Sequence, residues 1–390
     1  MAGTAGDTEE ALALLQAAMA PAEEARALEF AAYHDQGLFA LEMDRVFRGD
    51  WVAVCAEAAL AKPGDYLAIS VGGEPLALIR GTDGVLRALS NVCRHRGTLM
   101  LEPGADCLEQ GTIVCPYHAW SYSDSGAFRG APYTHGIEVD RDEHSLPSFR
   151  TEVWMGVVFV CLSSEAPPLA ERLAGITPHL AEFDMESFAV PGPLVAPEVW
   201  EANWKLIAEN GMESYHLFKV HEKTLEKVTP TRGAYYIEGS APWTLTGGKI
   251  VQGEGGVLGK LLSQLFGGAT AGDHYVLVSI PPSFVGVATL DSWDWIIVHP
   301  VSPTSSNVYQ GTLMRSAPDQ VTRAISDGYA TAFLEEDRAI CERAQAGMAA
   351  KLSRGGRLVP LERVVVDFHH YLGWRLTGES PPGKTVERAE

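Results

Sequence analysis

The sequence predicts an α+β fold with two domains. We expect an antiparallel β domain at residues 46–164 and a second domain, formed by residues 1–45 and 165–390, that combines an antiparallel sheet with long helices. Short strand-like runs separated by turn residues predict the first domain, and helical patterns around a later group of strands predict the second. Residues 163–168 are rich in Ser, Glu and Pro, which is typical of a linker and places the boundary there.

The β domain is predicted from the regular spacing of its strand-like runs. Residues 21–50 have a helical pattern, but from Trp51 onward apolar runs alternate with Gly, Pro and Asp turns at intervals of about ten residues. Connections this short join antiparallel strands. The expected strands are residues 51–54, 66–71, 75–80 and 86–90, with a continuation at 154–162.

The second domain is predicted to begin with a helix at residues 169–183. A longer helix should start near Glu201, and a final helix should run from residue 321 to about residue 352. Strand candidates between these helices are residues 275–287, 293–298 and 308–314. The glycines near residues 253–259 do not have the spacing of a dinucleotide fingerprint, so we predict a mobile loop there.

Composition and charge exclude several classes of partner. The chain has 390 residues and is 46% hydrophobic, which is enough for two or three packed cores. Its net charge of −20 should repel nucleic acid and anionic membranes. We see neither a secretory signal nor an apolar run that could span a membrane, and therefore expect a cytoplasmic protein. Six cysteines are too few for a disulfide scaffold, so metal binding is the expected paired use.

The first candidate metal site consists of Cys93, His95, Cys115 and His118. These residues form two mixed pairs, each at a turn, in which one Cys is followed closely by one His. A structural zinc site would more often group Cys with Cys and His with His. Mixed pairs suit a 2Fe-2S cluster in which one iron binds two thiolates and the other binds two imidazoles.

The second candidate metal site begins on the helix expected near residue 201. The spacing places Glu209, Glu213 and His216 on one helical face. His221 follows His216 by five residues, so the helix should end or kink between the two histidines to bring both rings to one point. Two histidines alone are often a structural accident, but the neighbouring carboxylates favour a metal site.

The final helix supplies a candidate carboxylate for the same site. Asp337 lies on an otherwise apolar stripe, and a buried carboxylate must be paired or bound to a metal. Two His and one carboxylate are the ligand set of non-haem Fe(II) oxygenases. Glu336 is the competing ligand, although its side chain should point away from the stripe. The stripe consists of Phe333, Asp337, Ile340, Ala344 and Met348.

Four short segments together resemble the signatures of the Rieske non-haem iron oxygenases of the aromatic-ring-hydroxylating type, in particular their α subunits. NVCRHRG at 91–97 and CPYHAW at 115–120 resemble the cluster signature. ENGMESYH at 209–216, with His221, and EDRAICE at 336–342 resemble the catalytic signature. The resemblance covers about residues 40–375. The spacer in the cluster signature is longer than usual and contains Cys107, which we interpret as a loop or packing residue.

The resemblance implies a fold, two cofactors and their ligands. The fold would be an antiparallel β Rieske domain combined with a helix-grip (START-like) catalytic domain. Each subunit would hold one 2Fe-2S cluster on Cys93, His95, Cys115 and His118. It would also hold one mononuclear Fe(II) on His216, His221 and Asp337.

The resemblance also implies catalytic roles for Glu213 and Asn210. Relatives form head-to-tail homotrimers, in which His118 of one subunit would meet Glu213 of the next. Most relatives have Asp at the Glu213 position, whereas oxygenases of carnitine-like compounds often have Glu. The sequence has no dinucleotide fingerprint and no ferredoxin Cys run. Electrons from NAD(P)H would therefore come from a separate reductase, with or without a ferredoxin.

The implied function is a terminal oxygenase that uses O2 to hydroxylate or oxidatively dealkylate a small organic substrate. Apolar side chains near His216 favour an apolar or aromatic substrate. The alternative is an N-alkyl or quaternary ammonium substrate held by an aromatic cage. Rivals from other classes are a Rieske electron carrier without oxygenase activity and a protein stabilised by structural zinc. The candidate cage residues are Tyr235, Tyr236, Trp243, Trp293 and Trp295.

Overall fold

The computed structural model describes residues 5–192, 195–240, 242–251 and 274–380. The chain divides into two compact units. Unit 2 is Phe47–Ala166, and unit 1 combines Met1–Val46 with Pro167–Glu390. These boundaries lie one and two residues from the boundaries predicted at residues 46 and 164. Each unit is described by itself below.

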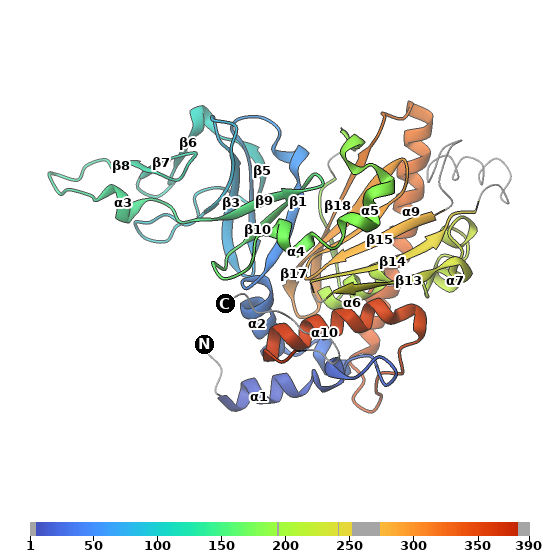
Figure 1. The fold of residues 1–390 in the computed structure, drawn as a ribbon. Coiled ribbons are helices and arrows are strands. Elements are labelled where there is room, and N and C mark those ends of the chain that lie inside the picture. The colour runs from blue at the N-terminus through green and yellow to red at the C-terminus, as the bar shows by residue number, and fades with distance from the viewer. Residues whose placement is uncertain (1–4, 193–194, 241, 252–273, 381–390) are drawn as a thin grey trace. The chain divides into compact units, whose positions relative to one another are not determined.

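Unit 2 is built on a seven-stranded antiparallel sheet with the strand order β1-β10-β9-β4-β3-β2-β5 (Figure 1). The predicted strands are present, and the run predicted at residues 154–162 is the end of one strand and the whole of the next. Turns with positive φ at Gly72, Gly73 and Gly84 join neighbouring strands. The strands are β1 (Trp51–Ala56), β2 (Asp65–Val71), β3 (Glu74–Arg80), β4 (Leu86–Ser90), β5 (Gly104–Cys107), β9 (Ser148–Trp154) and β10 (Val157–Cys161).

A smaller sheet of unit 2 lies beside the candidate cluster loops in sequence. It contains β6 (Thr112–Val114), β7 (Ser121–Ser123) and β8 (Phe128–Gly130), and the short helix α3 (Arg141–His144) follows. One buried core contains apolar residues from both sheets together with Cys93 and Cys115. The two thiols are therefore anchored in the interior of the unit.

Unit 1 contains an eight-stranded antiparallel sheet. Its strand order is β11-β18-β17-β16-β15-β14-β13, with β12 paired to β18 (Figure 1). The single strand predicted at residues 275–287 is wrong: β15 and β16 are separated by a turn containing Pro281 and Pro282, which lack the N–H that a ladder needs. The strands are β11 (Val190–Pro191), β12 (Glu198–Trp200), β13 (Tyr235–Ser240), β14 (Trp243–Lys249), β15 (His274–Ile280), β16 (Phe284–Ala288), β17 (Ser292–Ser302) and β18 (Ser305–Met314).

Helix α6 (Trp204–Met212) carries the predicted catalytic segment, and it packs against β15, β16 and β17. Asn203 caps its N-terminus by accepting a hydrogen bond from Lys205 N. The helix ends at Met212 because Glu213 is extended, with φ −118° and ψ 163°. The predicted helical face through Glu213 and His216 is therefore wrong: the break comes before His216, and α7 (Leu217–Val220) lies between the two histidines.

Helix α9 (Gln320–Gly347) supplies Asp337 and packs against α6 and α7. Asp319 caps its N-terminus, accepting hydrogen bonds from Val321 N and Thr322 N. The predicted apolar stripe is shifted by one residue: Ile340 is partly exposed, and the buried positions are Cys341 and Gln345. Gln345 is buried because its amide bonds to Asn203 N and to Tyr33 O.

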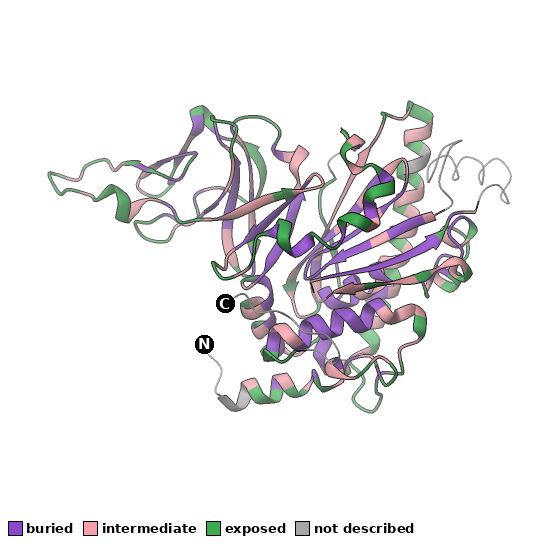
Figure 2. Ribbon diagram, in the orientation of Figure 1, coloured by how far each residue is buried: buried purple, intermediate pink, exposed green. Residues whose placement is uncertain are grey.

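The helix predicted at residues 321–352 is α9, which ends at Gly347. The prediction that it is the last helix was wrong, because α10 (Arg363–Thr377) follows it. Most of α10 is buried (Figure 2), and it packs against β13, β14 and α6. The remaining helices are α1 (Ala5–Ala13), α2 (Gln36–Leu41), α4 (Leu169–Leu173) and α5 (Thr177–Leu180).

The two units confirm the predicted α+β class, since unit 2 is mainly antiparallel sheet and unit 1 combines such a sheet with helices. Within the described residues, no helix has both the length and the apolar character needed to cross a bilayer. The glycine-rich segment predicted as a loop lies outside the described residues.

Candidate metal centres

Cys93 and Cys115 lie in two loops of unit 2 that share one hydrogen-bond pattern. Gly97 N donates to Cys93 O, and Ala119 N donates to Cys115 O, each at 3.0 Å. Each Cys N in turn donates to the carbonyl five residues later, Thr98 O and Trp120 O respectively. The pattern requires a left-handed residue four positions after each Cys, and the φ angles are 75° at Gly97 and 54° at Ala119.

The loops bury the two thiols and place the two imidazoles toward the surface. Cys93 and Cys115 are each 3% exposed, while His95 is exposed and His118 is partly exposed. The rings of His95 and His118 lie 4.7 Å apart, and Trp120 stacks on His95 at 4.5 Å. The two loops thus bury the two thiols and bring the two imidazole rings together nearer the surface.

The donor set fits a 2Fe-2S cluster with mixed ligands. Burial raises the pKa of the Cys93 thiol, and a hydrogen bond from the Tyr122 hydroxyl, 3.4 Å from Sγ, opposes that rise by favouring the thiolate. His118 Nδ1 is buried and has no hydrogen-bond partner among the described residues. A buried nitrogen without a hydrogen-bond partner is expected of an imidazole that binds a metal.

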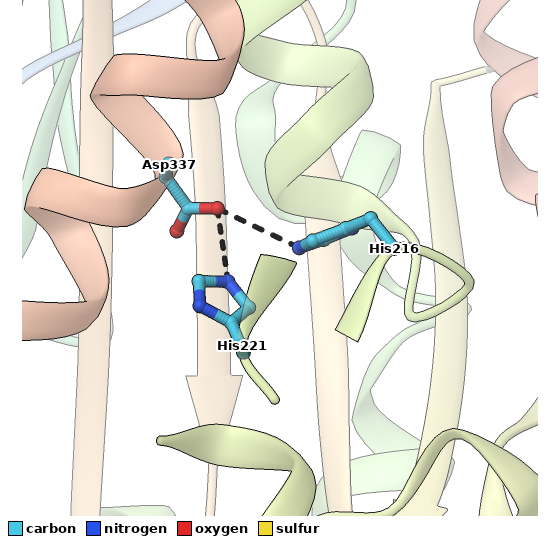
Figure 3. Close-up of side chains that lie close together, drawn as sticks. All are labelled: His216, His221 and Asp337. Carbon is cyan, nitrogen blue, oxygen red and sulfur yellow. Dashed lines mark hydrogen bonds and ion pairs between the residues drawn. The ribbon is translucent and has the colours of Figure 1, made fainter. Parts of the chain in front are cut away.

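In unit 1, His216, His221 and Asp337 converge on one point (Figure 3). One ligand atom from each lies within 4.8 Å of the others. Asp337 Oδ1 lies 3.5 Å from His216 Nε2 and 3.0 Å from His221 Nε2. The two histidines come from the two ends of α7 and are close in the sequence. The carboxylate comes from α9, which is far from both histidines in the sequence.

Each histidine is oriented by a second carboxylate. Glu213 Oε1 accepts from His216 Nδ1 at 2.6 Å, and Glu336 Oε2 accepts from His221 Nδ1 at 2.8 Å. The Nε2 atoms of both histidines therefore face Asp337. A histidine that donates from Nδ1 to a carboxylate has its Nε2 oriented for binding a metal. The expectation that Glu336 points away was wrong, because the α9 backbone turns its long side chain toward His221.

The electrostatics of this set favour a cation. Burial disfavours a charged His216, but hydrogen bonds to Asp337 and Glu213 outweigh that effect and raise the pKa of His216 to about 9. Burial also acts to raise the pKa of Asp337, yet its contacts with the two imidazoles give a net lowering. Three carboxylates around two imidazoles carry a negative formal charge, and ligation by two nitrogens and one oxygen suits a divalent iron.

Asn210 lies outside this ligand set. Its Oδ1 is 3.5 Å from Cys341 Sγ. Its neighbour Glu209 accepts hydrogen bonds from Tyr33 OH at 2.9 Å and from His369 Nε2 at 3.0 Å. Tyr33 and His369 were not predicted as site residues, although two adjacent histidines, His369 and His370, stand out among apolar residues in the sequence.

The comparisons with known proteins match both units. The Rieske [2Fe-2S] domain family matches residues 50–150, and the ring hydroxylating alpha subunit family, by its catalytic domain, matches residues 181–378. The carnitine monooxygenase oxygenase subunit of Escherichia coli K12 is 27% identical over 361 residues, covering 90% of this chain and 94% of that protein. The glycine betaine monooxygenase oxygenase subunit of Chromohalobacter salexigens is 32% identical over 196 residues, covering 50% of this chain but only 43% of that protein.

Solved structures share the fold over nearly the whole chain. A quaternary ammonium Rieske monooxygenase aligns with a TM-score of 0.78 at 23% identity, covering 93% of this chain and 98% of that one. Naphthalene 1,2-dioxygenase from Rhodococcus aligns with a TM-score of 0.74 at 18% identity, covering 96% and 98%. Two family matches in the expected order, on units that each gather a metal donor set, confirm the resemblance. The chain therefore belongs to the Rieske non-haem iron oxygenases, as a ring-hydroxylating type alpha subunit with a 2Fe-2S domain and a mononuclear iron domain.

Proposed function

We propose that the protein is the terminal oxygenase of a multicomponent Rieske system. The observation that carries the proposal is the presence of two different donor sets in one chain. Unit 2 holds a set of two cysteines and two histidines, and unit 1 holds a set of two histidines and one carboxylate. A Rieske electron carrier would need only the first set, and a zinc-stabilised protein would need neither His221 nor Asp337. The ligands are Cys93, His95, Cys115 and His118 for the cluster, with His216, His221 and Asp337 for the mononuclear iron.

Iron with two imidazoles and one carboxylate supplies O2 activation next to a bound substrate. The chain's own residues hold that site in shape. Glu213 and Glu336 keep each imidazole turned with Nε2 inward. Glu213 also accepts backbone hydrogen bonds from Tyr215 N and His216 N, so its carboxylate is fixed on both sides.

We assign Glu213 to electron transfer between subunits of a homotrimer. Its Oε1 accepts a hydrogen bond from the His216 ring, and its side chain is 10% exposed. In this proposal, Nε2 of His118 from a second copy reaches this carboxylate and completes the path from the cluster to His216. The electrons come from NAD(P)H through a separate reductase, with or without a ferredoxin.

The substrate class that we propose is an N-alkyl or quaternary ammonium compound, oxidised by hydroxylation or oxidative dealkylation. Glu213 at the position usually held by Asp supports this class, as do the two betaine- and carnitine-oxidising relatives. Naphthalene 1,2-dioxygenase shares the fold, which keeps an aromatic substrate as the second candidate. Of the proposed cage residues, Trp293, Trp295 and Trp243 are buried, while Tyr235 is exposed.

Purified protein tests the proposal. We expect a red-brown protein with about three irons per chain, and O2 and NADH consumption that depends on an added substrate when a surrogate reductase is present. Two irons per chain without substrate-dependent O2 uptake would indicate a Rieske electron carrier. A colourless protein that contains zinc would indicate a structural metal site.

A further inference from the structure

One face of the unit 1 sheet is turned toward α6. Directly paired residues of adjacent strands share a face, and the pairs Leu277–Val287, Val287–Asp294 and Asp294–Thr312 form one row across four strands. Ile296, two residues beyond Asp294, lies on the same face. A Cβ placed on Gly211 of α6 would lie 3.4 Å from Ile296 Cδ1, so α6 covers this face.

The same face leads to the mononuclear iron ligands. Tyr275 lies two residues before Leu277 on β15 and therefore shares its face. Its hydroxyl lies 3.1 Å from Ser214 Oγ, and Ser214 stands between Glu213 and His216. Asp294 is two strands away from Leu277, a distance of about 10 Å at the usual strand spacing.

Asp294 is a carboxylate without a cation on this face. It accepts a hydrogen bond from Ser292 Oγ at 2.5 Å, and no Lys, Arg or His pairs with it within the part of the chain that the structure describes. Burial raises the pKa of Asp294, and the hydroxyls of Ser292 and Thr312 lower it to a smaller extent. No charged group of β16, β18 or another described element contributes to this shift.

The nearest charged residues along the hairpin are engaged elsewhere or belong to the turn. The Arg315 guanidinium bonds to Leu290 O, Phe183 O and the side chains of Asp184 and Ser187. Asp291 lies in the turn between β16 and β17. The Asp294 residue is nevertheless partly exposed, as are Leu277, Val287 and Ile296.

We propose that Asp294 is the counter-ion for a positively charged nitrogen of the substrate and selects N-alkylated ammonium groups over neutral ones. The inference rests on the proposed function, since it assumes that substrate lies between this face and the iron ligands. A buried carboxylate is unfavourable unless it is protonated or paired with a cation. Alkylated ammonium groups have few or no N–H donors, so one carboxylate flanked by the apolar side chains of Leu277, Val287 and Ile296 suits them.

Binding of such a cation ionises the site. Burial raises the pKa of Asp294, so any proton that its carboxyl holds goes to solvent when the carboxylate pairs with the ammonium group. Lower pH must therefore weaken the binding of a cation and leave the binding of a neutral molecule of the same shape unchanged.

Choline and its neutral carbon isostere, 3,3-dimethylbutan-1-ol, form the matched pair of probes. Calorimetric binding to the metal-loaded protein, without O2 and without a reductase, gives both affinities. We expect choline to bind at least about tenfold more tightly than the isostere. Asp294→Asn should abolish that preference with little change for the isostere, and Asp291→Asn in the adjacent turn should retain it. An Asp294→Asn protein that keeps the preference, or a wild type without one, would overturn the proposal.

The pH dependence of the wild type gives a second test that needs no variant. Choline affinity should fall as the pH is lowered toward the raised pKa of Asp294, while isostere affinity stays constant. A choline affinity that does not fall at any pH at which the protein remains folded would refute the ionisation of Asp294. These measurements involve no turnover. A wild-type protein that has the expected iron content and O2 uptake but does not prefer choline to the isostere therefore rejects this inference alone. A retained preference without iron or O2 uptake rejects the proposed function instead.

Discussion

Glu336 Oε2 lies 2.8 Å from His221 Nδ1, so the neighbour of the proposed ligand Asp337 on α9 orients His221, the proposed ligand on the opposite side. Thr224 Oγ1 donates to the same carboxylate oxygen at 2.5 Å, which fixes the carboxylate in turn. Asp337 thus contacts Nε2 of both histidines, and its neighbour Glu336 contacts Nδ1 of His221. Glu213 does for His216 what Glu336 does for His221.

We expect Glu336→Gln to weaken mononuclear iron binding by about 10- to 100-fold, because the amide is a poorer acceptor for His221 Nδ1–H. Iron titration of the apo protein measures this, with the cluster absorbance as internal reference. Glu335→Gln, on the exposed neighbour, is the matched control and should bind iron like wild type. Equal affinities in both variants would remove Glu336 from the site.

Asp337→Ala should lose mononuclear iron and keep the 2Fe-2S cluster, because it removes the only carboxylate that contacts both Nε2 atoms among the described residues. Metal counting with the visible spectrum checks this outcome. Full iron occupancy in the variant would transfer the ligand role to another carboxylate, with Glu336 the first candidate.

Replacing either cluster histidine by cysteine should lower the reduction potential of the cluster. Thiolate donates more charge than imidazole and stabilises the oxidised state. His95→Cys and His118→Cys are the two variants, and redox titration gives the midpoint of each. Midpoints equal to that of the wild type in both would exclude these histidines as ligands.

Glu213→Gln should keep the cluster but bind mononuclear iron more weakly, because His216 Nδ1 loses its carboxylate. When saturated with iron, the variant should still fail to reoxidise its reduced cluster after substrate and O2 are added. The amide keeps the side-chain volume and removes the charge that binds the two histidines of the proposed path. Single-turnover absorbance of the pre-reduced protein follows the reaction. Glu222→Gln, an exposed residue beyond His221, serves as control. Wild-type reoxidation in Glu213→Gln would show that electrons bypass this residue.

The buried pair of Lys205 and Glu42 should stabilise the fold that presents α6. Lys205 Nζ lies 2.6 Å from Glu42 Oε1, and Trp204 Nε1 donates to Oε2 at 2.8 Å. Lys205→Met leaves the Glu42 carboxylate buried without its cation and should lower the free energy of unfolding by about 3–5 kcal/mol. Denaturant unfolding measures this. Arg87→Gln, which breaks an exposed pair with Asp83, should change stability little.

The sequence determined the local features of this protein. Strand periodicity located β1 to β4 and β10 of unit 2, since each of these runs lies between turns that Gly and Asp specify. The spacing of Cys93, His95, Cys115 and His118 identified two loops whose backbone pattern is set by residues four and five positions away. His216 and His221 were found for the same reason, because only one turn of helix separates them.

Tertiary structure alone decided the contacts between distant segments. Glu336 turns toward His221 across 115 residues, and Tyr33 and His369 meet at Glu209 from opposite ends of the chain. Helix α10 was not predicted from the sequence, and its packing in unit 1 buries Asp367, His369 and His370 together with its apolar residues. In the sequence, Asp294 is one acidic residue in a strand-like run. Only the register of the neighbouring strands shows that it lies on the face that α6 covers. Such contacts depend on how whole elements pack, and no local spacing encodes them.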